Sequence, residues 1–181
     1  GFGVMGLIIS LLPLSQLPAT NQQADTAMVQ ALGADYLAKI PQPVQAQMRP
    51  QPFALADVFR GIPTRQVRYT SGIPFAAPDG VPLKLNVYQP PQVGKYPAIV
   101  VIYGGAWQRG SPSGNAEFNR YMAARGYVVW AISYRHAPQY RFPAQIEDVQ
   151  AALAFIQQHA TEYETDLERI ALLGRSAGAH L

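Results

Sequence analysis

Three runs of mostly apolar, largely β-branched residues most constrain how this chain can fold. They occupy residues 98–103 (AIVVIY), 127–134 (YVVWAISY) and 169–173 (RIALL). Runs without polar alternation are typical of strands that are buried on both faces of a parallel sheet. Helices are predicted between them, over residues 115–125 and from Pro143 onward. This alternation predicts βαβ crossovers, so we expect an α/β fold with a mainly parallel sheet and helices on both faces.

An antiparallel pair of strands is predicted before these runs. Residues 66–70 and 83–88 have the composition of strands and are joined by a loop that contains an Asp-Gly pair. Apolar and polar side chains alternate in the second of these strands, which predicts one buried face. We therefore assign residues 65–181 to one α/β domain.

The residues before this domain differ in character. Residues 1–19 carry no charge, which favours a membrane-spanning or signal-like segment over an ordinary buried one, although Pro13 and Pro18 interrupt the apolar run. Residues 20–64 are expected to form a helix over residues 25–40, ended by Pro41, and then a Pro/Gln-rich linker with a short helix near residues 55–59. The protein is therefore expected to be membrane-anchored or exported, with a cytoplasmic location as the alternative.

The composition excludes several other classes of function. The 181 residues include no cysteine, which excludes disulfides, a thiolate nucleophile and Cys-bound zinc. The three histidines are not spaced as metal ligands, and we expect no metal and no cofactor. The net charge of +3 comes from scattered Lys and Arg, which argues against nucleic acid as a partner. The chain begins with Gly1 and ends at Leu181 in an apolar run, so we expect the N-terminal part of a longer protein; its oligomeric state is not predicted.

The sequence GRSAG at residues 174–178 is the strongest indication of chemistry. It matches G-x-S-x-G directly after a predicted buried strand, where a nucleophile elbow is expected. Gly174 and Gly178 are needed because side chains there would collide with neighbouring elements. Ser176 is therefore the candidate nucleophile, and the alternative is an ordinary Gly/Ser turn.

A second glycine-rich loop, YGGAW at residues 103–107, follows the first buried strand. Acyl transfer needs backbone N–H groups that stabilise an oxyanion, and small residues let the backbone approach the substrate. We assign these donors to Gly105, Ala106 and Ala177. Trp107 follows the loop and is a candidate for lining the substrate pocket.

These loops and a third stretch resemble the carboxylesterases of the α/β-hydrolase superfamily. YGGAW is similar to the H-G-G-G-W or H-G-G-A-W block of hormone-sensitive-lipase-like and feruloyl-esterase-like enzymes, and residues 133–149 are similar to their D-Y-R-L-A-P-E…F-P-A…E-D-V stretch. The resemblance covers residues 67–181. It implies an α/β-hydrolase fold and hydrolysis of a carboxylic ester through an acyl-serine intermediate, without a cofactor. Tyr103 stands where the family usually has His, so the hydrogen bonding of the oxyanion loop is expected to differ. Ser133 and Gln139 replace acidic residues that are mainly structural in the family.

The rest of a catalytic triad is not evident. In this fold the triad runs Ser, then Asp or Glu, then His along the chain, and only five residues follow Ser176. His136, His159 and His180 are expected to be structural or exposed. We therefore predict that residues 1–181 by themselves are catalytically inactive.

The sequence thus predicts a serine carboxylesterase or lipase-like hydrolase whose partner is a small or medium acyl ester. Two alternatives stay open: a serine peptidase or amidase on the same fold, and a non-catalytic binding protein that has kept it. Trp130 is expected in the core. For Arg175, beside the nucleophile, contact with a substrate carboxylate and contact with a neighbouring loop are both open.

Overall fold

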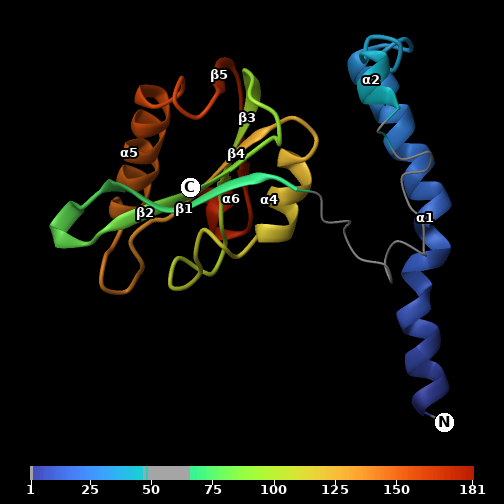
Figure 1. Ribbon diagram of the computed structural model, residues 1–181. Coiled ribbons are helices and arrows are strands. Elements are labelled where there is room, and N and C mark those ends of the chain that lie inside the picture. Colours follow the sequence, from blue (N-terminus) through green and yellow to red (C-terminus); the bar gives the residue numbers. More distant parts are fainter. Residues whose placement is uncertain (1, 47, 49–65) are drawn as a thin grey trace. The chain divides into compact units, whose positions relative to one another are not determined.

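The computed structural model describes residues 2–46, 48 and 66–181 (Figure 1). The chain divides into two units, Gly1–Phe59 and Arg60–Leu181, and each is described by itself. The expected short helix near residues 55–59 and the boundary before residue 65 lie outside the described residues, so both stay predictions.

The first unit is built on one long helix, α1 (Phe2–Leu32), which continues through Pro13 and Pro18. Its segment Gly3–Leu32 is long and apolar enough to cross a membrane, with a mean hydropathy of 1.4. An N-terminal signal sequence meets the same criterion. Its apolar side chains are exposed within this unit, as at Ile9.

The prediction of a separate helix over residues 25–40 is wrong. α1 runs into this segment without a break and ends before Gly33, which has a φ of +91° and donates its N–H to the carbonyl of Val29 at 2.9 Å. Glycine ends helices because it enters the left-handed region without a Cβ penalty. Pro41 instead precedes a one-turn helix, α2 (Gln42–Gln45), inside the predicted linker.

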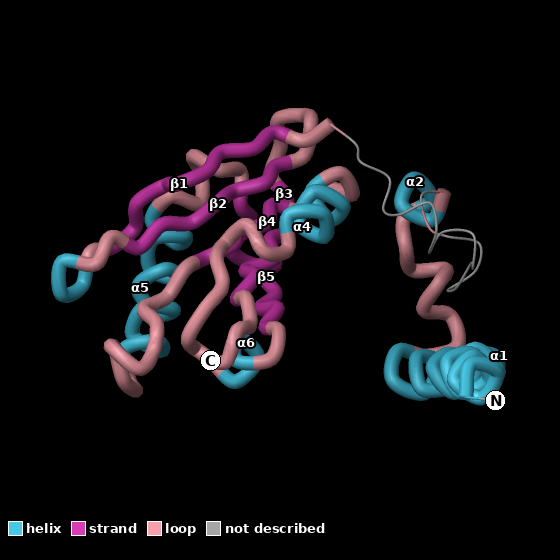
Figure 2. Tube along the Cα trace, turned by 90° about the horizontal axis from the view of Figure 1, so that it is seen from below, coloured by secondary structure: helices cyan, strands magenta, loops and turns pink. Residues whose placement is uncertain are grey.

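The second unit contains a five-stranded mixed sheet in the order β1-β2-β4-β3-β5 (Figures 1 and 2). β3 lies parallel to β4 and to β5, whereas β2 is antiparallel to both β1 and β4. The three apolar runs thus form the parallel part of the sheet, which confirms the α/β architecture. The strands are β1 Arg68–Ala76, β2 Leu83–Gln89, β3 Tyr96–Ile102, β4 Val128–Ile132 and β5 Thr165–Gly174.

Helices cover both faces of this sheet, as predicted (Figure 1). Consecutive side chains of a strand point to opposite faces, so Val100 and Val101 of β3 belong to two different clusters. α5 (Ala144–Gln158) packs on the face of Val100, where Trp130 is fully buried, and α4 (Ala116–Ala123) packs on the face of Val101. The remaining helical turns are η1 (Pro78–Gly80) and α6 (Ala177–His180).

β2 is buried on both faces, which corrects the prediction of one buried face. Leu85 and Val87 lie in the cluster on the α5 side, whereas Tyr88 lies in the cluster on the α4 side. The polar Asn86 is also buried, and its side-chain oxygen accepts a hydrogen bond from the backbone of β1 at 3.0 Å. β2 lies between β1 and β4, so Asn86 is covered although the sequence alternates, whereas Lys84 near the start of the strand is exposed.

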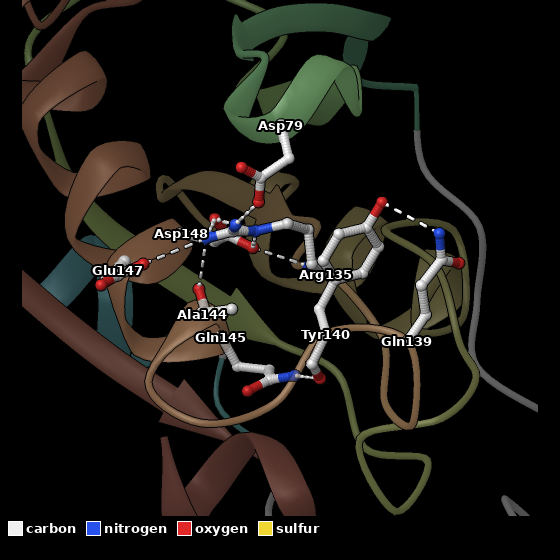
Figure 3. Close-up of polar contacts among 8 residues, drawn as sticks. All are labelled: Asp79, Arg135, Gln139, Tyr140, Ala144, Gln145, Glu147 and Asp148. Carbon is white, nitrogen blue, oxygen red and sulfur yellow. Dashed lines mark hydrogen bonds and ion pairs between the residues drawn. The ribbon is translucent and has the colours of Figure 1, made fainter.

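A buried ion cluster fixes the segment that follows β4 (Figure 3). The Arg135 Nε contacts both carboxylate oxygens of Asp148, at 3.0 and 2.9 Å, and the backbone N–H of Arg135 donates to the same carboxylate at 2.7 Å. The guanidinium also reaches Asp79 at 2.6 Å and Glu147 at 3.2 Å. These acidic partners, Asp148 above all, raise the pKa of Arg135, so its charge is permanent. The cluster therefore links β4, α5 and the turn between β1 and β2.

β5 has an open edge in the part of the chain that the structure describes. It pairs with β3 on one side only. Its Ile170 and Leu172 are 38% and 60% exposed, so the prediction that residues 169–173 are buried on both faces is wrong for the residues that the structure describes. Exposed apolar side chains along an unpaired strand are typical of a surface that further polypeptide covers.

Candidate active site

Ser176 lies at the sharp turn between β5 and α6. Its φ of 51° and ψ of −119° fall in a region that favours glycine, so the turn is strained. The serine is exposed, at the carboxyl end of the parallel strands. Ligands of open α/β sheets bind at this end.

The two glycines that flank the serine allow the turn to pack closely. A Cβ at Gly174 would lie 2.4 Å from the Cα of Ala179, and a Cβ at Gly178 would lie 2.1 Å from the carbonyl oxygen of Ile102. Both distances are far below an ordinary van der Waals contact. Any other residue at either position would push the turn away from its neighbours.

The loop after β3 approaches the same serine. A Cβ on Gly104 would lie 2.9 Å from the Cβ of Ser176. The next three residues all have a positive φ: +147° at Gly105, 53° at Ala106 and 60° at Trp107. This conformation is unfavourable for Ala106 and Trp107, and such strain persists only where surrounding contacts impose it.

Ser176 opens into a pocket of about 520 Å³ that both loops line. In the described part of the chain, no hydrogen bond uses the backbone N–H of Gly105, Ala106 or Ala177. The three N–H groups assigned to an oxyanion are therefore without an internal acceptor. The residues that line the pocket are Gly104, Gly105, Ala106, Arg109, Gly110, Arg175 and Ser176.

Two arginines bring positive charge to this pocket. Arg175 precedes the serine, and Arg109 comes from the loop opposite. Neither side chain forms an ion pair or hydrogen bond with another described residue. Arg109 was not predicted as a site residue, because it lies beyond the glycine-rich motif. A guanidinium is well suited to binding a carboxylate or phosphate.

Trp107 borders a second pocket, of about 360 Å³, rather than the pocket of the serine. The ring of Trp107 meets that of His180 edge-on, with centroids 5.4 Å apart. Most side chains around this space are apolar, so it suits an alkyl or aromatic group. Its lining residues are Trp107, Ala137, Phe142, Gln145, Ile146, His180 and Leu181.

The three histidines have other contacts, and none is hydrogen-bonded to Ser176 among the described residues. His136 Nε2 lies 2.9 Å from the hydroxyl of Tyr103. His159 contacts a surface glutamate at 2.8 Å, and His180 packs on an indole ring. Within the described ranges, no group of three or more His, Asp or Glu residues is placed to hold a metal ion. The described residues thus place Ser176 beside the glycine-rich loop, with no histidine of the described ranges bonded to it.

The contact between Tyr103 and His136 was not foreseen from the sequence. Burial is the main cause that raises the pKa of the Tyr103 phenol, and burial lowers the pKa of His136. Both side chains are therefore neutral at pH 7. The sequence held an indication of this contact, because Tyr103 and His136 each depart from the motif block in which they lie.

A family model described as BD-FAE matches residues 85–181. Esterase LipC of Mycobacterium tuberculosis is 40% identical over 101 residues, which are 54% of this chain and 25% of LipC. Esterase LipQ of the same organism is 30% identical over 169 residues, which are 89% of this chain and 40% of LipQ.

Solved structures of esterases share the fold. A thermophilic esterase from Thermogutta terrifontis has a TM-score of 0.56 and 32% identity, over 66% of this chain and 42% of that one. Esterase B from Lactobacillus rhamnosis has a TM-score of 0.60 and 26% identity, over 89% of this chain and 47% of that one. These neighbours confirm the α/β-hydrolase fold. The chain spans less than half the length of each of these relatives.

Proposed function

Because the chain belongs to the BD-FAE family, a hormone-sensitive-lipase-like family of α/β-hydrolases, we propose that it carries the nucleophile of a serine carboxylesterase. The observation that supports this most is Ser176 itself. It is strained and exposed, and it faces the glycine-rich loop across a shared pocket. Strain of this kind is maintained where function requires it.

In the proposed reaction, the Ser176 hydroxyl oxygen attacks the ester carbonyl carbon while a general base takes its proton. The negative charge on the former carbonyl oxygen is stabilised by the N–H groups of Gly105, Ala106 and Ala177. Collapse of this intermediate breaks the bond to the alkoxy group, which leaves with the proton as an alcohol. Water then hydrolyses the acyl-serine by the same two steps and releases the carboxylic acid.

We further propose that the base and its acidic partner come from polypeptide outside residues 1–181. None of the described histidines is bonded to Ser176, and a serine without an adjacent base is a weak nucleophile. The exposed apolar residues of β5, such as Leu172, supply a surface on which such polypeptide packs. Residues 65–181 would then be the N-terminal half of the hydrolase domain.

A comparison of the full-length protein with residues 1–181 tests this proposal. We expect the full-length protein to hydrolyse p-nitrophenyl butyrate and to leave the matching p-nitroanilide almost intact, because the proposed site is that of an esterase. Residues 1–181 alone are expected to show no ester turnover above background, because none of the described histidines is bonded to Ser176. Comparable turnover of the anilide would favour a peptidase or amidase, and binding without turnover by the full-length protein would favour a non-catalytic role.

For the N-terminus we propose membrane attachment or export through α1. The hydroxyls of Ser10, Ser15 and Thr20 donate to carbonyls within the helix, at 2.8, 2.7 and 3.0 Å. Polar groups that are satisfied inside the helix lower the cost of placing it in lipid.

Extraction of cell membranes with alkaline carbonate tests this attachment. We expect the full-length protein to stay with the membrane pellet, and the protein that lacks residues 2–32 to be released. If the segment is an export signal, the mature protein is released and its mass shows the loss of the N-terminus. A released protein with an intact N-terminus would contradict both forms of the proposal.

A further inference from the structure

Two departures from the family's motifs meet in the structure. The motif blocks that this chain resembles have His at the position of Tyr103 and Leu at the position of His136, two residues that this chain carries instead. The Tyr103 hydroxyl lies 2.9 Å from Nε2 of His136. An imidazole is thus present beside the oxyanion loop, but it comes from the segment after β4 rather than from the end of β3. We propose that the Tyr103–His136 pair positions the oxyanion loop, residues 103–110, for the esterase reaction proposed above, on which this inference rests.

The Tyr103 side chain is buried beneath this loop and packs against it. It is 5% exposed, and its ring is stacked on that of Tyr134, with centroids 4.5 Å apart and planes 21° apart. The hydroxyl of Tyr134 also donates to the backbone carbonyl of Tyr103 at 3.0 Å. The ring of His136 meets both tyrosine rings edge-on. The first residue of the loop is therefore held through its ring, its hydroxyl and its carbonyl.

Tyr103 and the segment after β4 also contact the middle and the end of the loop. The backbone N–H of Ala137 donates to the carbonyl of Trp107 at 2.8 Å. At the far end, Gly110 has a φ of +123°, and a Cβ there would lie 2.3 Å from Cδ2 of Tyr103. The Tyr103 ring thus lies directly under the point where the loop closes. Any turn of this ring would displace Gly110 and, with it, the residues that line the pocket.

The hydrogen bond to His136 prevents such a turn. A buried hydroxyl that loses its partner is unfavourable, so the phenol would move toward another acceptor or toward water. Ala106 and Trp107 would then lose part of the contact that keeps them at positive φ. The N–H groups of Gly105 and Ala106 would no longer be preorganised for the oxyanion, which forms only during the reaction. The pair is therefore expected to affect kcat rather than KM.

Variants that remove only the hydrogen bond test this role in the full-length protein. Y103F keeps the ring and removes the hydroxyl, and H136L removes the hydrogen-bonding partner of that hydroxyl. We expect each variant to lower kcat by about tenfold with KM within about twofold, which is less than the 10²–10³-fold cost of deleting an oxyanion donor. The double variant is expected to be no worse than either single variant, because residues that act as a unit are not additive.

Matched controls separate this role from a general loss of packing. H136Q restores an acceptor and is expected to keep kcat within about threefold of the unchanged protein. Y96F removes a hydroxyl at the opposite end of β3, where it bonds to the carbonyl of Gln92 at 3.0 Å, and H159L removes a histidine from the end of α5. Both controls are expected to leave kcat unchanged.

Hydrogen exchange of the loop provides a readout that does not depend on activity. Backbone amides of residues 104–110 are expected to exchange faster in Y103F and H136L than in the unchanged protein, and equally fast in Y96F. This measurement decides the inference even if the protein hydrolyses no ester. Variants that lower the unfolding midpoint while kcat and loop exchange in the folded protein stay unchanged would overturn it, as would a loss in kcat that H136Q shares with H136L.

Discussion

Replacing Ser176 by alanine is expected to lower kcat for ester hydrolysis in the full-length protein by about 10⁶-fold, the loss seen when a serine protease loses its nucleophile. The reason is that, among the described residues that line the pocket between the two loops, no residue besides Ser176 carries a hydroxyl group. The proposed oxyanion donors stay in place, so a small residual rate above the uncatalysed reaction is expected. Steady-state hydrolysis of p-nitrophenyl butyrate measures the effect.

Two further variants make this result specific. Ser71→Ala changes an exposed serine on β1, far from the elbow in the chain, and is expected to retain full activity. Ser176→Gly is expected to be as inactive as Ser176→Ala and more stable by about 1 kcal/mol, because glycine adopts the observed φ and ψ without strain. Retained activity in Ser176→Ala would contradict the assignment of the nucleophile.

The largest effect on stability is expected at Asp148. Asp148→Asn should lower the free energy of unfolding by about 3–5 kcal/mol, because it leaves the buried Arg135 without its main counter-charge. Arg135 and Asp148 are 6% and 1% exposed, so water cannot replace the lost partner. Urea unfolding followed by far-UV circular dichroism measures the change.

Glu147 provides the matched control for this prediction. It contacts the same guanidinium at 3.2 Å, but its side chain is 58% exposed. Glu147→Gln is therefore expected to cost less than about 1 kcal/mol, as is usual for pairs that include an exposed partner. Equal effects of the two substitutions would show that burial of an ion pair does not determine how much it contributes to the free energy of unfolding.

The parallel part of the fold could be predicted because its signal is local. Residues 98–103, 127–134 and 169–173 are apolar over a whole strand length, and they form β3, β4 and much of β5. The burial of β2 on both faces could not be predicted, because its alternation of apolar and polar side chains is typical of a strand with one buried face. Its burial on the second face depends on α4, which lies elsewhere in the chain. Pro41 predicted a helix that ends at residue 40. The structure ends α1 at Leu32, because Gly33 takes up a left-handed conformation directly after it.

The candidate site divides in the same way. Gly174, Ser176 and Gly178 lie within one short motif, and the reason for both glycines, contact with neighbouring backbone, could be given from the motif alone. Contacts between distant motifs could not be predicted. The bond between Tyr103 and His136 joins residues 33 positions apart, and its geometry depends on the register of β3 against β4.

The glycines around the pocket also bear on how such a site can evolve. A Cβ at any of five positions would come within 3.0 Å of another atom, and those positions are Gly104, Gly105, Gly110, Gly174 and Gly178. A mutational scan would find them intolerant although none offers a side chain to a substrate. Variation is instead open at exposed neighbours such as Arg109, Arg175 and Trp107. Descendants of this sequence are thus expected to change through a few side chains at the rim of the pocket, while the backbone around Ser176 is inherited almost unaltered.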